Sequence, residues 1–138
     1  MSETMVVDGD LLQFDPQFGD RTVTVVSPGT ITGTGHAMVK GKKLCILGDE
    51  GRVSIQATYF SAAFPTPGTG TIKISMLDSS QQALKSTSGG VLIVKGQQFT
   101  AMFTMGNPAK SPNQVPDTVL TSLGKGRFIT QQSFATVN

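Results

Sequence analysis

The sequence predicts an all-β domain, and three observations support this fold class. Apolar and polar residues alternate with a period close to two along most of the chain, as in half-buried strands. Glycine, proline, serine and threonine interrupt these runs about every 8–12 residues. Two near-copies, 37–47 and 92–102, each place Val-Lys-Gly and two polar residues between apolar stretches, which predicts β-hairpins. The chain has 138 residues, enough for one domain with its own core.

The expected elements follow from where turn residues stop each alternating run. Asp78 or a following serine is a suitable N-cap for the one short helix expected, over 78–85, which ends before the glycines at 89 and 90. Prolines at 108, 112 and 116 keep that stretch extended or turning. The strands are expected within 22–26, 31–32, 37–47, 53–59, 71–76, 91–105 and 118–137.

Charge divides the chain into two parts. Residues 1–20 hold five acids and no base, which predicts a loosely ordered or partner-bound acidic arm, or simply a solvated N-terminus. Residues 21–138 then form a single β domain, in which eleven bases oppose four acids. Only Lys40, Lys42 and Lys43 cluster, and lysines at a turn usually keep a hairpin tip in water. We therefore expect no nucleic acid partner.

Patterns typical of catalysis are scarce. Cys45 lies in the apolar run 44–47 and is predicted to be a small buried side chain. His36 is the single histidine, and a lone histidine near a turn is usually structural or exposed. The glycines of 33–35 and 68–70 lack the downstream Gly-Lys-Ser or helix of a phosphate-binding loop. The sequence therefore predicts a protein that is not an enzyme.

Residues 39–49 resemble a repeat of the PAAR family, whose members repeat an apolar stretch, Gly-Lys, a second apolar stretch and Gly-Asp. The second copy follows this pattern more loosely, with Gly106-Asn107 in place of Gly-Asp. The resemblance spans about residues 28–110. The residues that carry it are Val39, Lys40, Gly41, Gly48 and Asp49 in the first copy, and Val94, Lys95 and Gly96 in the second.

The resemblance implies a small cone of hairpins with quasi-threefold repetition and a structural function. Such tips cap the blunt end of a trimeric β-helical spike, one tip per three chains, and sharpen it for membrane piercing. The machines concerned are contractile injection systems, including phage tail-like particles and type VI secretion, and a tip also carries effector cargo in some of them. Ile72, Ile74, Met76, Phe99, Met102 and Met105, together with Phe128, are expected in the core or at the spike-facing base.

The same resemblance raises the question of zinc, which typical PAAR tips hold through histidines and a cysteine placed beyond the Gly-Asp turns. Residues 50–54 and 108–110 contain no histidine or cysteine. His36 and Cys45 alone do not complete a tetrahedral site. We therefore expect no zinc in the usual arrangement and no other cofactor, with the apex held by hydrophobic packing.

Two other classes of protein fit parts of the sequence. A small β-barrel or sandwich could bind glycan or single-stranded nucleic acid, although the chain has no tryptophan and a single tyrosine, Tyr59. Another self-assembling phage-tail subunit would explain the neutral surface equally well, since only 14% of the residues are charged. With no cationic start followed by a long apolar run, we expect synthesis in the bacterial cytoplasm without a signal peptide, followed by assembly into a particle.

Overall fold

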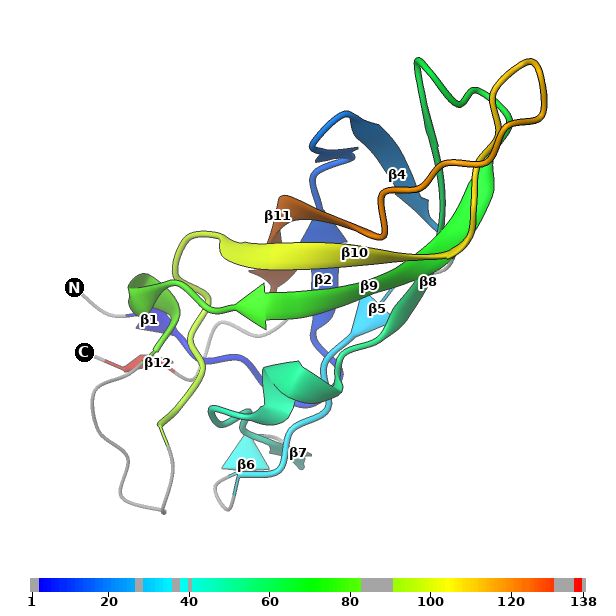
Figure 1. The fold of residues 1–138 in the computed structure, drawn as a ribbon. Coiled ribbons are helices and arrows are strands. Elements are labelled where there is room, and N and C mark those ends of the chain that lie inside the picture. Colours follow the sequence, from blue (N-terminus) through cyan, green and yellow to red (C-terminus); the bar gives the residue numbers. More distant parts are fainter. Residues whose placement is uncertain are drawn as a thin grey trace.

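The computed structural model describes residues 3–26, 29–35, 38–39, 41–82, 91–130 and 136–137. This part of the chain is built mostly from β-strands, which confirms the predicted fold class. Eight strands form one antiparallel sheet in the order β3-β4-β8-β9-β10-β11-β2-β5, which curls into an open half-barrel (Figure 1). The sheet contains β2 (Leu11–Phe14), β3 (Gln17–Phe18), β4 (Arg21–Val25), β5 (Gly29–Thr30), β8 (Ile55–Ser61), β9 (Gly68–Met76), β10 (Phe99–Asn107) and β11 (Thr121–Ile129).

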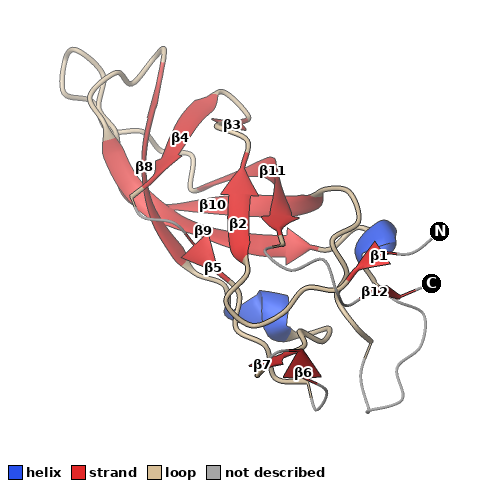
Figure 2. Ribbon diagram, turned by 180° about the vertical axis from the view of Figure 1, so that it is seen from behind, coloured by secondary structure: helices blue, strands red, loops and turns tan. Residues whose placement is uncertain are grey.

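Two much smaller sheets lie at one end of the molecule. One pairs β1 (Glu3–Thr4) with β12 (Thr136–Val137), so the first and last strands of the chain are neighbours. The other pairs β6 (Met38–Val39) with β7 (Lys42–Lys43). Figure 2 shows both on the same side of the half-barrel, opposite the loops that follow β8 and β10.

The core lies inside the half-barrel because the long strands alternate as their sequences predict. On β8 the side chains of Ile55, Ala57 and Tyr59 are buried, and the residues between them are exposed. An aromatic cluster fills the interior, with ring centroids 4.9 Å apart for Tyr59 and Phe103, and 5.1 Å for Phe99 and Phe128. These spacings are those of favourable aromatic pairs.

The structure divides the apolar residues that were expected in the core or at a spike-facing base. Ile72, Ile74 and Phe99 are buried in the core, as is Phe128, so these residues offer no surface to a partner. Met76 is 66% exposed at the end of β9. Met102 and Met105 are partly buried on β10, and Met105 packs against the core.

The expected acidic arm at residues 1–20 is wrong for residues 3–20. β2 pairs with β11, β3 pairs with β4, and the side chains of Val6, Leu12 and Phe18 belong to the core. The acidic composition misled the prediction because four of the five acidic residues, at 8, 10, 15 and 20, lie between the short strands of this segment.

Helical structure in the described residues is limited to two 3-10 turns. The first, η1 (Asp49–Arg52), follows Gly48, and the second, η2 (Ser79–Gln81), is capped by the Asp78 side chain, which accepts from the Ser80 N–H. The helix expected over 78–85 is therefore confirmed only as this capped turn, and its last three residues lie outside the described part.

A buried ion pair braces the end of the half-barrel where the loops after β8 and β10 lie. Arg21 contacts the Asp117 carboxylate at 2.9 Å, and both side chains are almost fully buried. Tyr59 donates to the same carboxylate at 3.2 Å and accepts from the Ala109 N–H at 2.9 Å. The network therefore fixes the 107–120 segment against β4 and β8.

Candidate functional site

Three short segments that are distant in sequence meet at the end of the molecule that carries the small sheets. They are residues 4–8, 43–47 and 91–95, and we call them together the ring. Each segment joins the next by an isolated antiparallel bridge, so that the end of one lies beside the start of another. The bridges are Val7 with Leu44, Ile46 with Leu92, and Val94 with Met5.

Six backbone hydrogen bonds close the ring at equivalent positions. The N–H groups of the three central residues donate in a cycle, from Val6 to the Ile93 carbonyl at 3.0 Å, from Ile93 to Cys45 at 3.0 Å, and from Cys45 to Val6 at 2.9 Å. The other three bonds also form a cycle, from Asp8 to Lys43 at 2.7 Å, from Leu47 to Val91 at 2.7 Å, and from Lys95 to Thr4 at 2.8 Å. The backbone therefore has the connectivity of a quasi-threefold triangle, although the three sequences differ.

The ring has one face toward the core and one face away from it. Val6, Cys45 and Ile93 are 0% exposed and belong to the core cluster of the half-barrel. Because side chains alternate along an extended segment, the residues on either side of these three lie on the opposite, outer face. The outer face is apolar throughout, with Val7, Leu44 and Val94 buried and Met5, Ile46 and Leu92 partly exposed.

A glycine in the left-handed region follows each ring segment. Their φ angles are 89° at Gly9, 112° at Gly48 and 49° at Gly96, values that side chains with a Cβ rarely adopt. In the first two turns the glycine is followed by an aspartate, Asp10 or Asp49. The backbone N–H of this aspartate closes the turn by donating to the carbonyl of Val7 or Ile46, respectively. The carboxylates of Asp10 and Asp49 also accept from the Val7 and Ile46 N–H groups, at 2.9 and 2.8 Å.

In the third turn the equivalent backbone N–H, that of Val94, is also hydrogen-bonded, but to a different group. Gln97 stands where the other turns have aspartate, and the Val94 N–H donates instead to the Gln81 carbonyl at 2.9 Å. The Gln81 side chain is 0% exposed and donates to the Lys95 carbonyl at 3.2 Å. A buried glutamine from η2 therefore replaces the aspartate at this corner.

Two titratable groups of the ring have shifted pKa values. Burial raises the pKa of the Cys45 thiol far above its usual range, and the nearby Asp49 and Asp10 carboxylates raise it further, so the thiol stays protonated. Burial opposes ionisation of Asp49, but hydrogen bonds from Thr34, Ile46 and Arg52 outweigh it and hold the pKa of Asp49 below its usual value. The Cys45 side chain therefore serves to pack the centre of the ring and is not an activated nucleophile.

Each described small sheet is an arm that extends one ring segment. β7 continues into the segment 43–47 and β1 into the segment 4–8. The two arms have the same register, since Met38 lies opposite Lys43 and Thr136 lies opposite Thr4. The C-terminal strand thus completes the repeat that begins at the N-terminus. The hairpin expected at Val39, Lys40 and Gly41 is confirmed at its described residues as the β6–β7 arm, with Gly41 at φ 82°, whereas Lys40 lies outside the described residues.

The second expected hairpin is wrong, and so is the repeat alignment behind it. Val94, Lys95 and Gly96 form a ring corner, which is equivalent to residues 46–48 and not to 39–41. The quasi-threefold element therefore has three copies at 4–10, 43–49 and 91–97. The sequence does relate the first two copies, Met5-Val6-Val7-Asp8-Gly9-Asp10 and Leu44-Cys45-Ile46-Leu47-Gly48-Asp49. Both have three apolar residues, one further residue, and then Gly-Asp.

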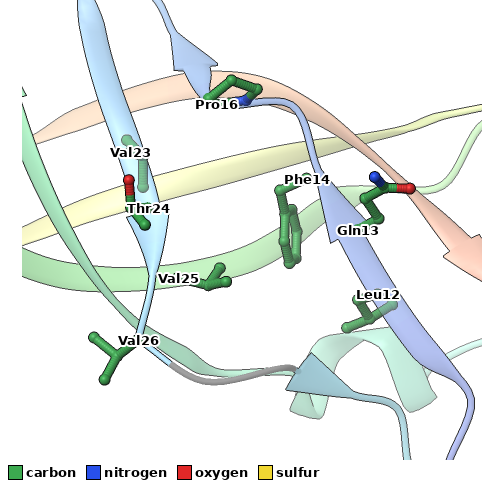
Figure 3. Close-up of a pocket in the computed structure, with 8 residues that line it drawn as sticks. All are labelled: Leu12, Gln13, Phe14, Pro16, Val23, Thr24, Val25 and Val26. Atoms are coloured by element: carbon green, nitrogen blue, oxygen red, sulfur yellow. The ribbon is translucent and has the colours of Figure 1, made fainter.

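A hollow on the side of the half-barrel is one alternative site. It has a volume of about 440 Å³ and separates β2 from β4, with Phe14 and Val25 facing each other across it (Figure 3). Its lining is mostly aliphatic and contains no charged side chain, whereas sites for glycan or single-stranded nucleic acid use several aromatic faces and cations. The lining residues are Leu12, Gln13, Phe14, Pro16, Val23, Thr24, Val25 and Val26.

Within the described residues, histidine, cysteine and carboxylate side chains form no group of three that could hold a metal ion. His36 lies outside these residues. The same part of the chain contains no helix of the length and apolarity needed to cross a bilayer.

The family model described as "Contractile injection system spike tip protein" matches residues 1–138, the whole of the chain. No curated protein matches the sequence.

Proposed function

Because the chain belongs to the contractile injection system spike tip family, we propose that its ring caps the blunt end of a trimeric β-helical spike, one chain for three spike chains. The family assigns the protein to the tip of the spike and makes it a structural component of the injection particle. The observation that carries the finer proposal is the closed quasi-threefold ring.

The ring suits a threefold partner for geometric reasons. The last turn of a trimeric β-helix ends in three equivalent strand edges around one axis, with apolar side chains that water does not satisfy. A single chain that offers three equivalent backbone segments covers all three edges at once. The inner face of the ring is already joined to the half-barrel through Val6, Cys45 and Ile93. Only the outer face therefore remains for the spike.

The rest of the fold then forms the leading point. The half-barrel extends from the ring away from the proposed spike side and ends in the loops at 62–67 and 108–120 (Figure 1). The buried pair of Arg21 and Asp117 braces these loops, as a part that meets a membrane under force requires. This function needs no catalysis, and we propose that the point is held by packing and hydrogen bonds without a structural zinc ion.

The proposal is tested by mixing the purified chain with the spike trimer of the same injection particle and measuring the mass of the complex by native mass spectrometry. We expect one copy per three spike chains. The double variant Ile46→Asp with Leu92→Asp places two charges on the outer face and should abolish the complex. Leu123→Asp is the matched control, because Leu123 is exposed on β11 and away from the ring. A chain that ignores the spike, or that oligomerises alone, would refute the proposal.

A further inference from the structure

We infer that a hollow at the point of the half-barrel binds a neutral sugar unit, held by the Arg21 guanidinium and the Asp20 carboxylate. The inference goes beyond the proposed function, because it assigns a ligand to the end of the molecule opposite the ring. The hollow has a volume of about 450 Å³, within the usual range for small-molecule sites. It lies between the β3–β4 turn, the loop after β8 and the segment 117–122.

One buried donor of Arg21 has no acceptor. Arg21 Nη2 donates to the Asp117 carboxylate at 2.9 Å and also to the Val119 carbonyl. Arg21 Nη1 is buried and has no hydrogen-bond partner among the described residues, and no other buried side-chain nitrogen or oxygen in that part of the chain is in this state. Leaving a buried donor of a charged group unsatisfied is costly, so a ligand oxygen at Nη1 is favourable.

The surroundings of the guanidinium leave the hollow as the route to Nη1. The rings of Tyr59 and Phe103 lie against the guanidinium, with centroids 4.6 and 5.6 Å from its central carbon. Asp117 contacts Nη2 on another side. Arg21 itself lines the hollow, so a ligand approaches its free donor from there.

Access to Nη1 requires a side chain at the rim of the hollow to move, because the atom is shielded from solvent. Gln17 is suited to this movement. Its side chain lines the hollow, is exposed, and donates to the Gly19 carbonyl at 3.0 Å. Water replaces such a surface hydrogen bond at little cost. The hollow can therefore open toward Arg21 without disturbing the core.

The charges in this hollow favour a neutral ligand. Unlike the hollow between β2 and β4, it is lined by charged side chains. Arg21 is already paired with Asp117, and Asp20 adds a second, exposed carboxylate. An anion would meet two carboxylates, and a cation would meet the guanidinium. A sugar hydroxyl both donates and accepts, so neighbouring hydroxyls satisfy Arg21 Nη1 and Asp20 together.

The rest of the lining suits the carbon and oxygen atoms of a sugar ring. Phe64 and Val119 offer apolar surface to its C–H groups, and Val119 is 56% exposed. Gln17 and two serines add groups that hydrogen-bond to hydroxyls. A purely apolar ligand would leave these groups and Nη1 without partners. If the ring meets the spike, as proposed above, this site lies at the leading end, where the particle meets its target (Figure 1).

The experiment adds D-glucose, D-galactose or D-mannose to the isotope-labelled full chain and follows the Arg21 side-chain signals by NMR. We expect at least one sugar to shift these signals with a Kd of about 1 mM, as typical ligand efficiency gives for about twelve non-hydrogen atoms. Asp20→Ala should weaken this binding about tenfold. Asp15→Ala is the matched control and should change it less than twofold, because Asp15 is also exposed but does not line the hollow.

A second variant fills the hollow without removing a charge. Ala63 is exposed in the loop after β8 and lines the hollow. Ala63→Trp should therefore abolish sugar binding and leave the melting temperature unchanged. Sugar binding that survives this substitution would place the ligand elsewhere and overturn the assignment.

Inorganic phosphate and acetate, added in the same way, test the class of ligand. If either anion binds more tightly than the sugars, the assignment of a neutral ligand is wrong. If no sugar binds, or if Asp15→Ala and Asp20→Ala act alike, the hollow is not a sugar site and water alone satisfies Nη1. None of these results bears on the cap, whose failure appears separately as the absence of a complex with the spike.

Discussion

Replacing Ile93 with alanine tests whether the central side chains of the ring form part of the core. Ile93 is 0% exposed, and the substitution removes three buried carbons. At about 0.8 kcal/mol for each carbon, the transfer cost is about 2.4 kcal/mol, and the cavity left at a hydrogen-bonded ring raises the total to about 3–4 kcal/mol. For a domain of this size, the melting temperature should fall by about 10–15 °C in differential scanning calorimetry.

Ile46→Ala is the matched control, since it makes the same substitution on the other face of the ring. Ile46 is partly exposed, so we expect a loss of about 1 kcal/mol. Spike binding should respond in the opposite order, with Ile46→Ala weakening it more than Ile93→Ala does. Equal stability losses for the two variants, or a loss below about 1 kcal/mol for Ile93→Ala, would refute the assignment of the two faces.

Other parts of the structure give further predictions. Asp117→Ala leaves the Arg21 guanidinium buried without its partner and should cost about 3–5 kcal/mol in urea unfolding, whereas an exposed pair would cost under about 1 kcal/mol. Gly48→Ala should lower the unfolding free energy by about 1–2 kcal/mol because of its positive φ, and Gly51→Ala, in open space without such a φ, should not. The pKa of Asp49 is lowered by folding, so its ionised form stabilises the native state above the unfolded pKa near 3.8, and this contribution is lost as the pH falls through the lower folded pKa. Asp49→Asn should therefore reduce the fall in melting temperature between about pH 5 and pH 2, and an unchanged acid profile would contradict the shift. Protein purified without added metal should contain less than one equivalent of zinc by elemental analysis and keep its melting temperature in a chelator; stoichiometric zinc would overturn the proposed metal-free point.

The alternating strands were predictable because their pattern depends on local burial. Residues 53–59 and 71–76 alternate in sequence, and the structure places 55–59 on β8 and 71–76 on β9. The expected sides are buried, except that Met76 is exposed at the end of β9. The Asp78 cap was also predictable, since a capping side chain acts within three residues. The first hairpin followed from the glycine at its turn, which adopts a positive φ.

The ring was not predictable in detail because its contacts join segments distant in sequence. The motif Val-Lys-Gly occurs at 39–41 and 94–96, yet it forms a hairpin turn in one place and a ring corner in the other. What the three copies share is a pattern of hydrogen bonds, and Gln81 shows that a residue from another element can supply one of them. The first copy was not recognised because it contains Asp8 and Asp10, and acidic residues are also typical of a solvated N-terminal tail.

The central claim is that the outer face of the ring meets the spike along a shared axis. Electron cryomicroscopy of the spike end of an assembled particle tests it most directly. The account predicts that the ring axis coincides with the threefold axis of the spike, with Met5, Ile46 and Leu92 against its last turn. Density that places the loops at 61–67 or 107–120 against the spike, with the ring pointing outward, would contradict it.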